Sequence, residues 1–113
     1  MGRGMITFSD RIYCENISEK KIDLIKLGIK QGRGRLKLFL IALSNNDSDQ
    51  LDIFHNSLLK QRLFRKLDLR IVGFADSKDE AIGIVQNMLD ETIEQTGTCN
   101  IKAYLTDKYF VKD

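Results

Sequence analysis

The sequence predicts a single-domain α/β protein, a β-α-β-α-β-α-β sandwich with a mainly parallel sheet of about four strands. The chain has 113 residues, which suits one domain. Strand-like apolar runs alternate with segments of helical spacing, an order typical of strands joined by helical crossovers. We expect the α/β domain over residues 11–105, an N-terminal extension over residues 1–10 for which disorder is one expectation, and a C-terminal tail over residues 106–113.

The first strand is expected at residues 11–14, and its small apolar content places it at an edge of the sheet, where an antiparallel orientation is open to it. A helix follows, with Ser18 as its N-cap. The helix ends near Lys30, because Gly32 and Gly34 break it. Its apolar side chains are predicted to share the buried face: Ile22, Ile25 and Ile29, supported by Leu24 and Leu27.

The middle of the chain predicts two strong strands with a helix between them. Residues 36–43 form the first strand, since every residue from Leu38 onward is apolar, as in a strand covered on both faces. A polar loop follows at residues 44–50. Three apolar residues after this loop have the spacing of a helix: Leu51, Phe54 and Leu58. The second strand is expected at residues 69–75, where Gly73 predicts the close approach of a neighbouring backbone.

The last part of the chain predicts a capped helix and a final strand. Ser77 and Glu80 have the spacing of a capping box, and Gly97 closes the helix behind them. Residues 99–105 then alternate between apolar and polar side chains, as a half-buried strand does. This strand completes the predicted alternation of strands and helices.

Cysteine usage and hydropathy indicate a protein of the reducing cytoplasm. The two cysteines, Cys14 and Cys99, do not make a disulfide framework, and we expect both thiols to be buried and inert. The longest apolar run, from Leu38 to Leu43, is far shorter than the roughly 20 residues that span a bilayer. The first ten residues lack the apolar core of a signal peptide. We therefore expect no membrane partner.

The net charge of +2 is unevenly distributed, since residues 1–75 hold 14 basic against 8 acidic side chains and residues 76–113 hold 4 against 8. Two basic blocks, residues 20–37 and 60–70, lead into strands that we expect to be parallel. Because loops that precede parallel strands lie at one edge of the sheet, the blocks are expected to merge into a surface that binds nucleic acid or an acidic protein. The alternative is an ordinary solvated face. The predicted contact residues are Lys30, Arg33, Arg35, Lys37, Arg62 and Arg65.

The run Gly32-Arg33-Gly34-Arg35 raises the question of a phosphate-binding loop. Such a loop lies between a strand and the helix that follows it, so that backbone amides and the positive end of the helix dipole face the anion. Here the predicted order is helix, glycines, strand, and the negative end of the dipole faces the loop. The run is therefore a helix-ending turn that displays two arginines.

Acidic and amide side chains follow the predicted strands, at the edge where open α/β sheets bind ligands. Asp76 at a strand end and Asp47 on a neighbouring loop are a candidate pair for a divalent cation such as magnesium. The alternative is that these side chains cap helices. His55 is the only histidine, and with no nucleophile elbow in the chain we expect it to be a packed or surface residue. We expect no cofactor and assign no catalytic residue.

Four segments resemble small hypothetical α/β proteins of Firmicutes: "KKIDLIKLGIKQGRGRLKLFLIAL", "LDIFHNSLLKQ", "DLRIVGFADSKDEAIGIVQNMLDETIEQTG" and "IKAYL". The resemblance covers nearly all of residues 17–105. It implies a bacterial, cytoplasmic origin. Because no activity is assigned to that family, it supplies no catalytic residue.

The leading functional hypothesis is a non-enzymatic binding or adaptor module that engages an anionic partner through its basic surface. The alternative is an enzyme or small-ligand binder that uses Asp47 and Asp76, with or without a divalent cation. A third hypothesis is a homo-oligomer, such as a homodimer, whose apolar faces and tail pair across a dyad. Tyr109, Phe110 and Val111 in that tail are expected either to cover an exposed edge of the sheet or to dock on another copy.

Overall fold

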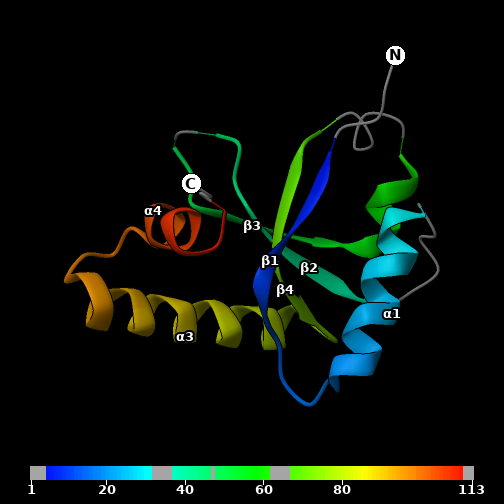
Figure 1. Ribbon diagram of the computed structural model, residues 1–113, viewed down its shortest axis with the longest axis horizontal. Helices are drawn as coiled ribbons and strands as arrows, with labels where there is room; N and C mark the ends of the chain where they lie inside the picture. The colour runs from blue at the N-terminus through cyan, green and yellow to red at the C-terminus, as the bar shows by residue number, and fades with distance from the viewer. Residues whose placement is uncertain (1–4, 32–36, 47, 62–66, 111–113) are drawn as a thin grey trace.

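A four-stranded sheet of order β1-β4-β2-β3 forms the centre of the molecule, as a computed structural model shows (Figure 1). The structure describes residues 5–31, 37–46, 48–61 and 67–110. The strands are β1 (Ile6–Tyr13), β2 (Phe39–Leu43), β3 (Leu51–His55) and β4 (Leu69–Ala75). The α-helices are α1 (Glu19–Lys30), α3 (Lys78–Thr96) and α4 (Ile101–Leu105). Two short helical segments complete the chain: η1 (Asn56–Lys60) is a 3₁₀-helix and η2 (Thr106–Phe110) is a π-helix.

The chain is a mixed α/β single domain, but the prediction of a mainly parallel sheet is wrong. Only β1 and β4 pair in parallel, while β2 runs antiparallel to both β4 and β3. The reversal arises because residues 51–55 form a strand rather than the predicted helix. In β3 the half-buried Leu51 and Ile53 flank the exposed Asp52, which is a strand period of two. A short polar connection therefore joins two antiparallel neighbours and replaces the expected crossover.

The final predicted strand is also wrong, since residues 101–105 form the helix α4. The side chain of Asn100 caps this helix and accepts a hydrogen bond from the Ala103 amide at 3.1 Å. Ile101 and Leu105 are buried. Residues four apart share a face of a helix and also share a face of a strand, so their spacing does not distinguish the two.

The strand β1 begins at Ile6, so residues 6–10 belong to the sheet and not to an N-terminal extension. It occupies an edge, as expected, but it pairs with β4 in parallel. Its register shifts between Phe8 and Tyr13. The polar residues inside this irregular stretch break the apolar alternation that sequence reasoning relies on.

The strongest local signals are confirmed. The Ser18 hydroxyl caps α1, accepting from the Lys21 amide at 3.3 Å. The Ser77 hydroxyl accepts from the Glu80 amide at 3.0 Å, while the Glu80 carboxylate accepts from the Asp76 amide at 2.8 Å. Local capping therefore sets the starts of both long helices.

Two glycines behave as the sequence predicts. Gly97 ends α3 with a left-handed φ of 75°. A Cβ atom on Gly73 would lie 2.8 Å from the Tyr13 carbonyl oxygen, so the close approach of β1 to β4 requires glycine there.

The sheet separates two hydrophobic cores (Figure 1). On one face, α1 packs against the sheet through Ile25 and Ile29. On the other face, α3 and α4 pack through side chains that include Met88 and Leu105. The tail segment η2 lies beside the edge strand β1, and its partly buried Tyr109 and Phe110 pack on this second core. No helix in the described part of the chain is long and apolar enough to cross a bilayer.

Candidate binding surface and the Glu91 cluster

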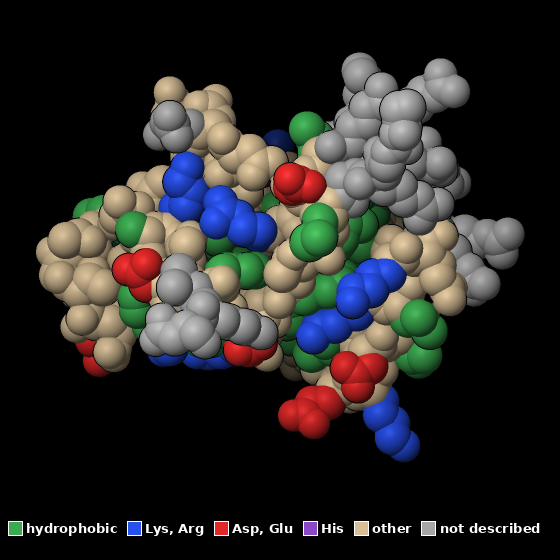
Figure 2. Space-filling model, turned by 45° about the horizontal axis from the view of Figure 1, so that its top comes forward, with side chains coloured by type: hydrophobic (Ala, Val, Ile, Leu, Met, Phe, Trp, Pro, Cys, Tyr) green, Lys and Arg blue, Asp and Glu red, His purple; other side chains and the backbone are tan. Residues whose placement is uncertain are grey.

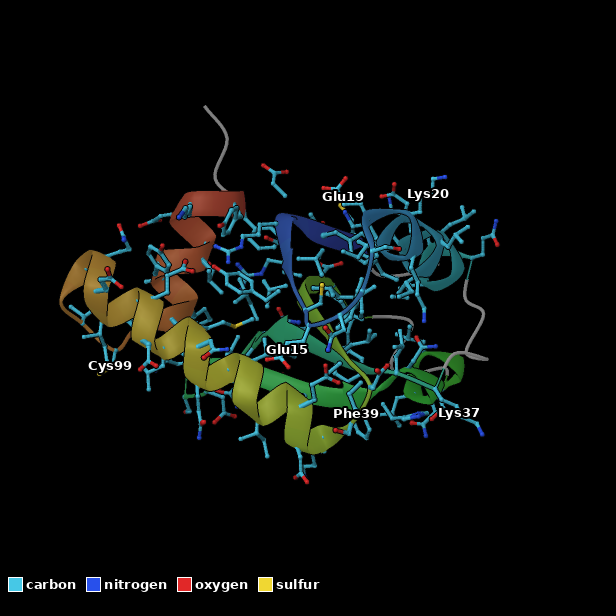
Figure 3. All side chains as sticks on the ribbon, turned by 90° about the horizontal axis from the view of Figure 1, so that it is seen from below. Glu15, Glu19, Lys20, Lys37, Phe39 and Cys99 are labelled. Atoms are coloured by element: carbon cyan, nitrogen blue, oxygen red, sulfur yellow. The ribbon has the colours of Figure 1, made fainter. Side chains whose placement is uncertain are left out.

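The predicted basic surface is only partly within the described residues. Lys30 is the exposed last residue of α1, and its Nζ lies 5.7 Å from the centre of the Phe8 ring. Lys37 is exposed just before β2, beside Phe39 (Figure 3). The arginines of the prediction lie outside the described residues: Arg33, Arg35, Arg62 and Arg65.

The two basic blocks were predicted to merge on the premise that the strands they precede are parallel, but β2 and β4 are antiparallel. Phe39 at the start of β2 pairs with Ala75 at the end of β4, while Leu43 pairs with Arg70. The segments that lead directly into these two strands therefore enter the sheet from opposite ends of the strands. Figure 2 shows Lys and Arg side chains in separate groups on one face of the molecule.

The outer face of α1 carries a feature that the sequence reasoning misplaced. Leu24 and Leu27 were expected on the buried face, yet they are 67% and 52% exposed. At 100° per residue they lie opposite Ile25 and Ile29, which face the core. Two large apolar side chains on adjacent turns therefore meet solvent.

Lysines border this leucine pair. We define the α1 outer face by five residues that neighbour one another at helical spacings of three and four: Lys20, Lys21, Leu24, Leu27 and Lys30. Two exposed acidic residues, Glu19 and Asp23, lie on the same helix beside them, and Figure 3 shows Glu19 next to Lys20 on the α1 side of the molecule. The surface thus combines exposed apolar area with basic neighbours.

The predicted cation pair is not supported by the topology. Asp47 lies outside the described residues, but Asn46 and Ser48 on either side of it follow β2, whereas Asp76 follows β4. Because these strands are antiparallel, the two segments lie at opposite edges of the sheet. Among the described residues no group of three or more His, Cys, Asp or Glu side chains is placed to hold a metal ion.

The loop after β2 instead has a structural partner in α4. The Lys102 ammonium donates hydrogen bonds to the carbonyl oxygens of Asn46 at 2.9 Å and Asp49 at 3.1 Å. The side-chain oxygen of Gln50 accepts from the Ile101 amide at 2.6 Å. The Gln50 side chain therefore accepts from a backbone amide at the N-terminal end of α4, and Lys102 of α4 holds the loop through its carbonyl oxygens.

His55 also has a local role. It ends β3, and its Nδ1 accepts a hydrogen bond from the Ser57 amide at 3.1 Å, which caps the 3₁₀-helix η1. Its ring packs edge-on against Phe39, with ring centres 5.2 Å apart. The expectation was a packed or surface histidine in a helix, and His55 is instead a half-buried residue at the end of a strand.

A second site joins three distant parts of the chain around one carboxylate. Glu91 on α3 accepts hydrogen bonds from the hydroxyls of Tyr13 at 2.7 Å and Tyr104 at 2.8 Å. Its other oxygen accepts from an Arg11 Nη1 at 3.2 Å. Lys108 donates to the Tyr104 hydroxyl at 3.1 Å. We call these five residues the Glu91 cluster.

The protonation states in the Glu91 cluster favour stable hydrogen bonds between β1, α3 and α4. Partial burial favours the neutral form of Glu91, but hydrogen bonds from Tyr13 and Tyr104 and the charge of Arg11 outweigh it, and its pKa is lowered. Burial, together with the bond to Glu91, raises the pKa of Tyr13. At neutral pH an ionised acceptor therefore holds protonated hydroxyl donors, and the cluster ties β1, α3 and α4 together.

Beside this cluster lies an open cavity of about 310 Å³, lined by polar side chains that include Asn87 and Glu91. Cys14 contributes to its wall. Burial, then the charge of Glu80, raises the pKa of this thiol, so it stays protonated at neutral pH.

The prediction that both thiols are buried is wrong. Cys14 is partly exposed and Cys99 is exposed. Cys99 lies beyond the end of α3, in the connection to α4 (Figure 3). Both thiols are unpaired, as the sequence predicted.

Comparison of the chain with protein-family models, with curated proteins and with solved structures found no match. The functional proposal below therefore rests on the side chains of the described residues. The Glu91 cluster was missed because no local spacing relates residues 11, 13, 91, 104 and 108. The exposure of Leu24 and Leu27 could have been predicted from the sequence, because both residues fall outside the helical stripe of the isoleucines.

Proposed function

We propose that this chain is a binding module that uses the α1 outer face to bind an acidic, partly apolar segment of a partner protein. The observation that carries the proposal is the exposure of Leu24 and Leu27 on the solvent side of a helix. A bacterial cytoplasmic setting and a non-enzymatic role are parts of the same proposal.

The apolar content of the surface favours a protein partner over nucleic acid. Phosphate binding needs cations and gains little from aliphatic side chains, whereas protein interfaces have an apolar centre and a polar rim. Leu24 and Leu27 would form that centre, and Lys20, Lys21 and Lys30 would form the rim. The rim would favour partners that present carboxylates and would speed their association.

The expected affinity contribution follows from the two leucines. Burying a leucine side chain contributes about 1.5–3 kcal/mol in transfer terms, and interface ordering offsets part of it. A loss of about 1.4 kcal/mol is a tenfold weakening of binding. Replacing both Leu24 and Leu27 by serine should therefore weaken binding tenfold or more.

The test uses two labelled probes and fluorescence anisotropy. One is a helical peptide with leucine at spacings of three and four and glutamate elsewhere; the other is a DNA duplex of random sequence. We expect the wild type to bind the peptide and the double variant Leu24→Ser/Leu27→Ser to lose this binding. The control Ile82→Ser, at an exposed apolar position on α3, should bind as the wild type does.

Two outcomes would overturn the proposal. One is peptide binding that the double variant Leu24→Ser/Leu27→Ser leaves unchanged. The other is duplex binding with a steep salt dependence and no peptide binding, which would return the function to phosphate contacts.

A further inference from the structure

The strand β3 ends the sheet, and its outer edge carries backbone groups that have no partner among the described residues. The amide of Ser44 donates to the Gln50 carbonyl at 3.0 Å, and the amide of Asn56 donates to the Leu38 carbonyl at 2.8 Å. These bonds set the alternation of the antiparallel pair, in which every second residue of β3 faces β2.

The intervening residues of β3 face outward. By this alternation the N–H and C=O groups of Leu51, Ile53 and His55 point away from β2. Among the described residues no backbone hydrogen bond engages the N–H and C=O groups of Leu51 and Ile53 or the N–H of His55, whereas the His55 carbonyl, at the N-cap of η1, accepts the first bond of that helix. A row of unpaired donors and acceptors of this kind is a template for another strand.

Several of the usual protections of an edge strand are missing from β3, although it is a short strand of five residues. Its pairing with β2 has no register shift, whereas the other two strand pairs both have one. Proline does not occur anywhere in the chain, and residues 51–55 contain no lysine. Asp52 is the only carboxylate in the strand. The edge is therefore regular, and among the described residues no strand pairs with it.

We propose that β3 pairs with β3 of a second copy of this chain, antiparallel and with Ile53 on the two-fold axis. The outward residues are symmetric about Ile53, so the strand is complementary to itself. In this register Ile53 faces Ile53 of the second copy, and Leu51 faces its His55. The two copies of Ile53 then exchange two hydrogen bonds, and each His55 N–H donates to the Leu51 carbonyl of the other copy, about four bonds in total.

The side chains agree with this register. Leu51 and Ile53 are half-buried at the margin of the core under α3, and a second copy would cover them further. On the other face Asp52 meets Phe54 of the second copy, so no two carboxylates oppose each other. The edge lies apart from the α1 outer face, so this inference is independent of the proposed function.

The first measurement is the native mass of the full chain by light scattering, with backbone amide exchange followed by NMR over the same concentrations. We expect the mass to rise from 13.0 kDa toward twice that value. The Ile53 amide should become protected over the same range. The amide of Asp52, which faces β2, is the internal reference and should be protected throughout.

The matched variants are Ile53→Lys, which sets two lysines against each other on the axis, and Ile82→Lys on α3. We expect Ile53→Lys to weaken self-association at least tenfold and Ile82→Lys to leave it unchanged. A monomeric mass at every concentration would refute the proposal. A doubled mass with an unprotected Ile53 amide would equally refute it, because another surface would then form the dimer. The amide measurement on the wild type decides the case even where Ile53→Lys fails to fold.

Discussion

Replacing Glu91 by alanine should destabilise the fold, because one carboxylate holds three segments together. The Tyr13 hydroxyl donates to Glu91 at 2.7 Å and the Tyr104 hydroxyl at 2.8 Å. Tyr13 is only 7% exposed, although the open cavity beside the cluster lets some water reach the position of the lost acceptor. The variant therefore leaves a buried donor without its partner.

The magnitude follows from these contacts. A hydrogen bond to a charged group contributes about 1.5–3 kcal/mol, and the bond from the buried Tyr13 falls in that range. Tyr104 is more exposed and contributes less. The ion pair with Arg11 is largely in water and adds about 0–1 kcal/mol. We expect Glu91→Ala to lower the free energy of unfolding by about 2–4 kcal/mol, a Tm decrease of roughly 8–16 °C for a domain of this size.

The assay is thermal and urea unfolding followed by circular dichroism, with Glu94→Ala as the matched control. Glu94 is an exposed glutamate on the same helix. Its substitution should change stability by about 0.5 kcal/mol or less. Equal Tm values for Glu91→Ala and Glu94→Ala would refute the reasoning, because the cluster would then contribute no more than an ordinary surface glutamate.

The same carboxylate predicts a pH dependence. Hydrogen bonds and nearby cations lower the pKa of Glu91 in the folded state below the value of about 4.3 for an unperturbed glutamate. Its stabilisation is therefore complete above that unfolded value and is lost as the pH falls through the lower folded value. The variant Glu91→Gln should show a flatter loss of stability in acid than the wild type. A parallel decline in both proteins would contradict the assignment.

Two further substitutions test the packing of the sheet and of the loop after β2. Gly73→Ala should destabilise by about 1–3 kcal/mol in urea unfolding, because its methyl group would lie 2.8 Å from the Tyr13 carbonyl. Gly83→Ala on α3 meets no atom within 4 Å and should stabilise by up to about 1 kcal/mol, so an equal response of the two glycines would contradict the argument. Lys102→Met removes the donor to the loop carbonyls and should lower the Tm, whereas Lys78→Met at an exposed position should not; no difference between them would show that the ammonium does not hold the loop.

The parts of the fold that could be predicted are those whose signals are local. Ser18 and Ser77 accept hydrogen bonds within their own helical turns, so their positions mark the starts of α1 and α3. Gly97 supplies the left-handed residue that ends α3. The apolar run of β4 is covered on both faces and has no competing helical pattern.

The elements that were predicted wrongly are decided by tertiary contacts. Leu51, Phe54 and Leu58 have helical spacing, but the first two belong to β3 and the third to η1. α4 forms beside the Gln50 side chain, which accepts from the Ile101 amide at a sequence separation of 51 residues. No window of a few residues contains that information.

The orientation of one short strand removes the premise that the two predicted sites shared. Both the merged basic surface and the Asp47–Asp76 pair were derived from a parallel sheet, in which equivalent ends of strands meet at one edge. In the structure β2 is antiparallel to both β3 and β4. The segments that precede β2 and β4 therefore lie at opposite ends of the strands, and so do the segments that follow them. Features carried by a single element do not depend on strand direction. The α1 outer face and the outer edge of β3 are features of this kind, and this is why they support proposals where the sheet-edge sites do not.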